Sequence, residues 1–135
     1  MPGPPVQLIL ARNLLSSLST PAFLVDKDGN LLFFNEAAGV MLGRRYEETG
    51  RMRAEEWIAM FGPFDDDGQP MPFSDVPLTA ALRGDRPVHA GFRIRSVKGV
   101  DHEIQASAFP LIDGEDFHGA LVVFWPAEVD GRALA

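Results

Sequence analysis

The apolar positions near the start of the chain predict one amphipathic helix over Val6–Leu18. Four side chains recur there at intervals of three or four, the spacing of one helix face: Leu8, Ala11, Leu15 and Leu18. Three more apolar residues widen this stripe: Ile9, Leu10 and Leu14. So broad a stripe favours two packing surfaces, the chain's own sheet and a partner's copy. Ser19-Thr20-Pro21 ends the helix, and residues 1–5 form a stiff, proline-rich arm before it.

The next segment predicts two short strands and then a helical region. Residues 22–26 and 30–35 are strand-like, and Asp26-Lys-Asp-Gly29 forms the turn that joins them. Asn35 stands at a helix N-cap position, since apolar residues follow it at helical spacing up to Leu42. We expect one or two short helices over 44–60, a loop over 62–72 and a helix over 75–83.

The last third of the chain predicts three strands. Apolar and polar residues alternate over 91–97 and again over 102–111, the pattern of half-buried strands. Residues 119–125 are apolar on both faces, so this strand should be central and covered on both sides. The order of elements predicts an α+β domain with a five-stranded antiparallel sheet, short helices on one face and the N-terminal amphipathic helix.

Composition narrows the classes of function. The 135 residues suit one domain, and 46% hydrophobic with 23% charged residues is ordinary for a globular protein. The absence of cysteine excludes disulfides and thiolate chemistry. A net charge of −7 disfavours nucleic acid and anionic membranes as partners. The apolar runs are far shorter than the about 20 residues of a membrane span, and the start lacks an export signal, so we expect a cytoplasmic protein.

Motifs for catalysis or metal binding do not emerge from the sequence. Neither Asp-x-Asp-Gly turn places oxygen ligands at EF-hand spacing, and there is no nucleophile elbow or phosphate loop. One basic cluster is present: Arg44, Arg45, Arg51 and Arg53. It is interpreted mainly as a solvated helix face, with contact to an acidic partner as the alternative. We therefore expect no catalytic, metal-binding or cofactor-binding residues.

Several motifs in this order resemble a PAS sensory domain. The segment Val25-Asp-Lys-Asp-Gly-Asn-Leu-Leu-Phe-Phe-Asn-Glu-Ala-Ala38, continuing to Leu42-Gly43 and Glu47-Glu-Thr-Gly50, resembles the opening of such a domain. Asp67-Gly-Gln-Pro-Met-Pro72, followed by 75–84, resembles its loop and long helix. The resemblance covers roughly residues 14–124 and implies a sheet in the order 2-1-5-4-3, with 119–125 in the middle.

The end of the chain departs from the family. In sensors connected to a downstream enzyme, the last strand usually leads into an Asp-Ile/Val-Thr signature, whereas this chain continues as Trp125-Pro-Ala-Glu-Val-Asp130. We expect a stand-alone domain; the alternative is one separated from its effector. The expected division is an arm and cap helix over 1–18, the PAS domain over 19–126 and a tail over 127–135.

The chain has more aromatic and flexible apolar side chains than covering one sheet needs, with small Ala106 and Ala108 opposite them, which indicates a ligand pocket. Twelve residues are expected to line it: Phe34, Met41, Leu42, Trp57, Met60, Leu78, Leu82, Phe92, Ile94, Ala106, Val122 and Phe124. Such a pocket suits a small apolar ligand, and the alternative is a filled core. Haem in this family uses a histidine on the helix matching 75–83, which has none here, and His89 only follows it.

We expect a regulatory module of signal transduction that forms a homodimer and has no catalytic step. The interface should combine the N-terminal helix with the outer sheet face, through Leu8, Ala11, Leu15, Leu18, Phe109, Leu121, Val123 and Trp125. A small apolar ligand and a signalling protein are the other expected partners. The alternatives are a dedicated small-molecule sensor and, least favoured, a cone-shaped isomerase or dehydratase with His102 as its base.

Overall fold

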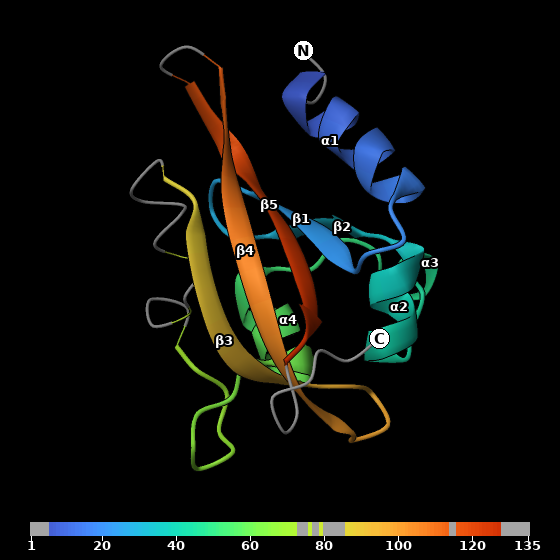
Figure 1. Ribbon diagram of the computed structural model, residues 1–135, viewed down its shortest axis with the longest axis vertical. Coiled ribbons are helices and arrows are strands. Elements are labelled where there is room, and N and C mark those ends of the chain that lie inside the picture. The colour runs from blue at the N-terminus through green and yellow to red at the C-terminus, as the bar shows by residue number, and fades with distance from the viewer. Residues whose placement is uncertain (1–5, 73–75, 77–78, 80–85, 114–115, 128–135) are drawn as a thin grey trace.

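The computed structural model describes residues 6–72, 76, 79, 86–113 and 116–127, which form one sheet with helices on both of its faces (Figure 1). The helices are α1 (Val6–Ser17), α2 (Glu36–Leu42), α3 (Tyr46–Thr49) and α4 (Ala54–Phe61). The strands are β1 (Ala22–Asp26), β2 (Leu31–Phe34), β3 (Val88–Arg95), β4 (Asp101–Asp113) and β5 (Asp116–Pro126). In the described part of the chain, no helix has the length and apolar character needed to cross a membrane.

The sheet is antiparallel with the order β2-β1-β5-β4-β3, as the resemblance implied. Strand β5 is central and pairs with β1 through Phe23 opposite Val122, and with β4 through Ala106 opposite Phe124. Its successive side chains point to opposite faces; the inner ones are buried, whereas the outer ones, Leu121, Val123 and Trp125, are only partly covered. Strands β4 and β5 extend beyond their predicted ranges at both ends, and β3 starts three residues before its predicted range but ends two residues short of it, because backbone pairing does not follow the alternation of side chains.

The inner face of the sheet carries the larger hydrophobic core. Helices α2 and α4 cover it, and the buried side chains include Val25, Phe34, Trp57, Phe61 and Ile104. The indole Nε1–H of Trp57 donates to the carbonyl of Gly29 at 2.8 Å, which ties α4 to the β1–β2 turn. The helix expected over 75–83 lies outside the described residues, apart from the buried Val76 and Thr79.

Helix α1 packs on the opposite, outer face. Leu8, Ala11 and Leu15 are buried against Ala22, Leu24 and Phe33 of the same chain. Arg12, beside this contact, places its guanidinium carbon 4.6 Å from the centre of the Phe33 ring, a cation–π distance. The predicted helix is therefore confirmed, and one of its apolar stripes is covered by its own sheet.

The side chain of Asn35 connects α1, β1 and α2. It is 2% exposed and takes part in five hydrogen bonds. Its Oδ1 accepts from the backbone N–H groups of Ala22 at 3.1 Å and Ala38 at 3.0 Å, and the second bond caps α2 as predicted. Its Nδ2 donates to the carbonyls of Leu15, Leu18 and Thr20 at 3.1, 3.5 and 2.8 Å.

The two Asp-x-Asp-Gly segments form equivalent turns. Asp26 Oδ1 accepts from the backbone N–H groups of Asp28 and Asn30, both at 2.9 Å. Asp65 Oδ1 accepts in the same way from Asp67 and Gln69, at 2.9 and 3.0 Å. In both turns one carboxylate oxygen organises the backbone locally, which supports the interpretation of these segments as turns.

Two arginines of the basic cluster mark the starts of helices. The backbone N–H of Arg45 donates to Glu48 Oε1 at 3.0 Å, and that of Arg53 donates to Glu56 Oε1 at 3.1 Å. These backbone hydrogen bonds lower the pKa of Glu48 and of Glu56 below the usual value of a glutamate. The arginine side chains pair with the same glutamates and remain exposed.

Gly119 allows β5 to approach β1 closely. Its φ is +146°, and a Cβ at this position would overlap the carbonyl oxygen of Val25. Gly99 also has a positive φ, +84°, but nothing lies near the position of its missing Cβ. A side chain added at Gly99 would therefore cause backbone strain alone, whereas one added at Gly119 would cause strain together with steric overlap.

We expect Gly119→Ala to destabilise the domain by more than Gly99→Ala does. The control substitution adds only backbone strain, about 1–3 kcal/mol, whereas Gly119→Ala also pushes apart the central strand pair. Urea unfolding followed by circular dichroism measures both free energies. Equal losses in the two variants would contradict the proposed close approach of β5 to β1.

Candidate functional site

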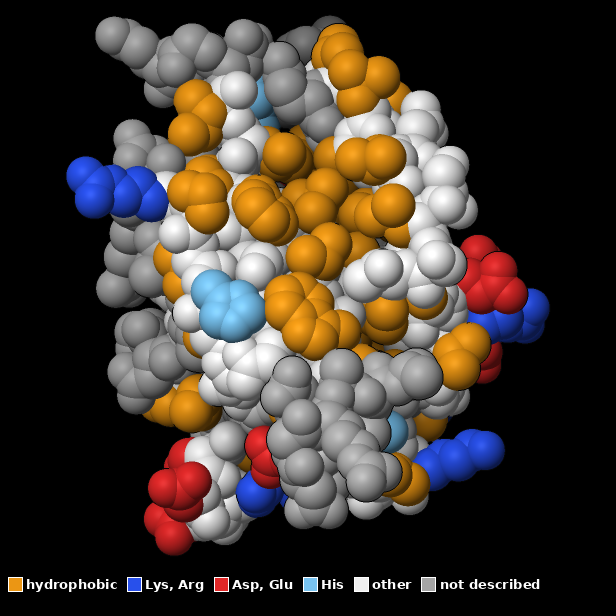
Figure 2. Space-filling view, viewed as in Figure 1, with side chains coloured by type: hydrophobic (Ala, Val, Ile, Leu, Met, Phe, Trp, Pro, Cys, Tyr) orange, Lys and Arg blue, Asp and Glu red, His pale blue; other side chains and the backbone are white. Residues whose placement is uncertain are grey.

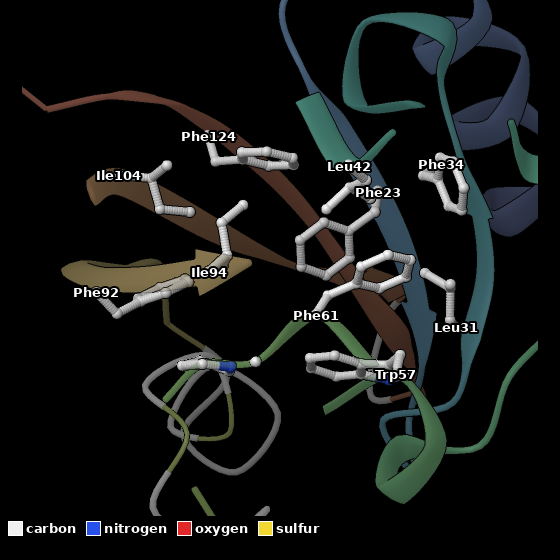
Figure 3. Close-up of a pocket in the computed structure, with 12 residues that line it drawn as sticks. Phe23, Leu31, Phe34, Leu42, Trp57, Phe61, Phe92, Ile94, Ile104 and Phe124 are labelled. Atoms are coloured by element: carbon white, nitrogen blue, oxygen red, sulfur yellow. The ribbon is translucent and has the colours of Figure 1, made fainter. Parts of the chain in front are cut away.

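A small cavity lies between the inner face of the sheet and helix α4 (Figure 3). Its volume is about 50 Å³, and its wall is almost wholly apolar. The lining residues are Phe23, Leu31, Phe34, Leu42, Trp57, Phe61, Gly62, Pro63, Phe92, Ile94, Ile104 and Phe124. The indole N–H of Trp57 is already bonded to Gly29. The wall would therefore hold an apolar guest through shape and contact rather than through hydrogen bonds.

Half of the residues expected in the pocket line this cavity: Phe34, Leu42, Trp57, Phe92, Ile94 and Phe124. Ala106 and Val122 are buried in the surrounding core, and Met41 and Met60 are partly buried against it. Leu78 and Leu82 lie outside the described residues. The cavity thus lies next to a core that is otherwise filled, and the ligand pocket stays a prediction.

Sequence reasoning missed the contribution of the first strand and the end of α4. Phe23 lies in the wall, and its ring centre is 5.8 Å from that of Phe124 and 6.0 Å from that of Trp57. Alternation along β1 places Phe23 and Val25 on the inner face, and this signal was available in the sequence. His102, the base considered for an enzyme, pairs with Ile94 in the β3–β4 ladder and is not among the lining residues.

A second candidate site is the outer apolar face, formed jointly by α1 and the strands. Its exposed members are Val6, Ile9, Leu10, Leu14, Phe109 and Trp125. Partly buried Leu18, Leu111, Leu121 and Val123 lie between them and the core beneath α1. Figure 2 shows a continuous hydrophobic area over these elements, and among the described residues in this view the charged side chains lie around its margin.

The residues expected at a dimer interface fall into two groups. Leu8, Ala11 and Leu15 are buried inside the chain itself, and Leu15 is 0% exposed. The others belong to the outer apolar face: Phe109 and Trp125 are exposed, and Leu18, Leu121 and Val123 are partly buried. The outward stripe of α1 is instead Val6, Leu10 and Leu14, which repeat every four residues along the helix.

Polar side chains border the outer apolar face on β3 and β4. His89 is exposed there, and its Nδ1 lies 3.0 Å from Ser107 Oγ and its Nε2 lies 2.8 Å from Gln105 Oε1. Its ring centre is 5.6 Å from that of Trp125. His89 thus lies on the opposite side of the sheet from the cavity, a position that does not suit a ligand of a group held inside.

Two cross-strand ion pairs continue this border toward the end of β3. Arg93 bonds to Glu103 at 2.8 Å, and Arg95 bonds to Asp101 at 2.7 Å. The hydrogen bond from Arg95 lowers the pKa of Asp101, and the bond to Glu103 raises the pKa of Arg93. Both pairs are substantially exposed, so they favour the register of the ladder while adding little stability.

A wider, open groove of about 710 Å³ runs between the end of α1 and the helices α2 and α3. Arg44 and Arg45 of the basic cluster line it, together with Glu36, Glu47 and Glu48. Because both signs of charge meet in this groove, it presents no basic surface for an acidic partner.

The comparisons with known proteins agree with this architecture. A family model described as PAS fold matches residues 10–58, which run from the middle of α1 to within α4. No curated protein matches the chain.

Three solved structures illustrate the structural likeness. A LOV protein of Rhodobacter sphaeroides has a TM-score of 0.72 at 15% identity, covering 95% of this chain and 71% of that one. The PAS domain of Bordetella pertussis BvgS has a TM-score of 0.60 at 15% identity, covering 92% and 88%. A PAS domain from a two-component sensor histidine kinase has a TM-score of 0.61 at 18% identity, covering 90% and 97%. The sheet order, the match over residues 10–58 and these likenesses together identify the chain as a domain of the PAS fold.

Proposed function

We propose that this domain is a sensory or regulatory module of signal transduction that acts by forming a homodimer through its outer apolar face. The observation that carries the proposal is this face itself, because monomeric proteins rarely expose a continuous apolar area of large extent. Its similarity to PAS domains, including one from a sensor kinase, supports the same class of function.

A second copy of the chain is the occupant that the charges favour. Each copy carries a net charge of −7, so two copies approach most easily where their surfaces hold no charges. The outer apolar face is made of such residues, and a two-fold axis through it would place the same side chains opposite one another. Burying the exposed parts of Leu10 and Leu14, which are 61% and 54% exposed, would contribute about 1–2 kcal/mol for each side chain.

The inner cavity supports a narrower role as a sensor of a small apolar molecule. At about 50 Å³ the cavity is well below the about 300–1,000 Å³ of sites that bind drug-sized ligands. A guest must therefore be very small unless the wall rearranges. A signalling partner would respond to the population of dimer geometries that the guest favours.

We propose no catalytic step for this module. The cavity wall consists of aromatic and aliphatic side chains with one glycine and one proline, and none of them titrates. A reaction chamber of the isomerase or dehydratase kind needs an acid or base that projects into the cavity. His102, the candidate considered for that role, is not part of the wall.

The wild-type domain should show a mass that rises with concentration toward that of a dimer. Replacing both Leu10 and Leu14 by glutamate places charges within the contact and should leave a folded monomer, because both side chains point away from the core. Sedimentation equilibrium measures the association, and circular dichroism confirms folding. Leu15→Asp would not serve, since Leu15 is wholly buried and its replacement tests the fold instead.

Val40→Glu is the matched control for this experiment. Val40 is 80% exposed on α2, outside the outer apolar face, and the substitution adds one glutamate there, half of the charge that the double variant adds. The control should associate as the wild type does. A wild-type domain that stays monomeric at millimolar concentration, or equal weakening by the control, would exclude the proposed interface.

Xenon should bind in the inner cavity, because an apolar cavity of this kind stays dry and accepts apolar atoms. Under xenon pressure, the methyl resonances of Ile94 and Ile104 should shift. Ile94→Phe should reduce this response by filling the space, whereas Val122→Ile, in the same core but outside the wall, should preserve it. Unchanged methyl resonances in the wild-type domain would indicate that the cavity is closed to guests.

A further inference from the structure

Asn35 lies between the inner cavity and helix α1, and its side chain is bonded toward both. We propose that Asn35 is a positioning residue that transmits rearrangements of the cavity wall to α1. The inference deepens the proposed function, since α1 carries half of the outer apolar face. The proposed coupling acts within one chain, however, so it does not depend on whether the dimer forms.

On the α1 side, the Asn35 amide donates to carbonyl groups in the last turn of the helix and in the segment that follows it. The last carbonyls of a helix have no partner within it. Asn35 Nδ2 donates to the carbonyl of Leu15 at 3.1 Å and to that of Thr20 at 2.8 Å, in the segment that leads into β1. The position of one buried amide group therefore fixes where α1 ends above the sheet.

On the cavity side, Asn35 is joined directly to one residue of the wall and is connected to a second through α2. Phe34 precedes it in the chain and lines the cavity. Asn35 Oδ1 accepts from the N–H of Ala38 at 3.0 Å and so caps α2, the helix that carries Leu42 into the wall. A guest or a substitution that displaces Phe34 or Leu42 must move the Asn35 amide or break one of its bonds.

The Asn35 amide has little freedom to adjust on one side alone. It is 2% exposed, and a buried amide that loses a partner is costly. Its two hydrogens face α1 while its oxygen faces β1 and α2. A change at either side is therefore carried to the other by the same planar group.

Asn30 is a natural matched control. Like Asn35, it flanks β2, and its Oδ1 accepts from a helix-start N–H, that of Ala54 at 3.3 Å. Its Nδ2 donates to Asp26 Oδ2 at 3.2 Å and has no bond to α1. The two asparagines thus both accept a hydrogen bond at the start of a helix, and they differ in the hydrogen bonds to α1, which are the connection under test.

The experiment is a cycle of substitutions read by amide hydrogen exchange. Leu42→Ala perturbs the cavity wall, and Asn35→Ser keeps an oxygen for the Ala38 N–H while removing both donors to α1. In the wild-type background, we expect Leu42→Ala to accelerate exchange of the α1 amides about tenfold, the equivalent of one net hydrogen bond. In the N35S background, α1 should already exchange fast, and Leu42→Ala should add less than about twofold. In the N30S background, the tenfold response should persist.

Amides of α4 serve as the internal reference, because Trp57 and Ile58 report on global opening of the core. Equal acceleration of α1 by Leu42→Ala in the wild-type and N35S backgrounds would overturn the proposal. So would acceleration of α1 and α4 alike by N35S, which would reduce Asn35 to a residue that stabilises the whole domain. Measuring exchange in dilute and in concentrated samples separates the effect of Asn35 within one chain from any effect of dimer formation.

A reciprocal measurement covers the case in which N35S does not fold. Coupling between two sites acts in both directions, so loosening α1 should affect the α2 cap. Leu15→Ala, at a residue whose carbonyl accepts from Asn35, should accelerate exchange of the Ala38 amide more than Leu8→Ala, which removes a side chain of the same cluster nearer the start of α1. Equal effects of the two variants on Ala38 would contradict the role of Asn35.

Discussion

The need to satisfy one buried amide constrains how this domain is assembled. An unpaired amide in an apolar interior costs roughly 2–7 kcal/mol, so the fold keeps every partner of Asn35 within bonding distance. Those partners belong to the end of α1, the start of β1 and the start of α2. Elements that cover opposite faces of the sheet therefore meet at one side chain, and neither layer can shift freely against the other.

The sheet itself joins the two candidate sites. Along β5, Val122 and Phe124 face the inner core, whereas Val123 and Trp125 alternate with them toward the outside. The inner face is closed by helices except for a small cavity, but α1 covers only part of the outer face. A single core would require apolar residues on only one face of β5, yet both faces are apolar. The partly uncovered outer face explains the difference, and it favours a second copy of the chain as the remaining cover.

Alternation, turns and caps are local signals, so the sequence predicted most of the described elements, whereas the sheet order was implied by the resemblance to PAS domains. The sequence pattern over α1 contained two apolar stripes, and periodicity cannot decide which one faces the chain's own sheet. Leu15 was therefore assigned to a partner, although it lies wholly inside. Asn35 was identified as a cap for the same local reason, but its bonds to Leu15 and Thr20 span 20 and 15 residues and depend on the assembled fold. Phe23 was missed because the alternation of side chains along β1 was not used to assign residues to its inner face.

The size of the cavity sets a limit on any switch that a guest could drive. A guest of two or three non-hydrogen atoms can gain at most about 3–5 kcal/mol on binding. Reversing a two-state equilibrium from 1:99 to 99:1 takes about 5.5 kcal/mol of differential affinity. A sensor with so small a cavity must therefore hold two placements of α1 that are close in energy. The two donor bonds from Asn35, each worth about 0.5–1.5 kcal/mol net, are of the right size to set that balance.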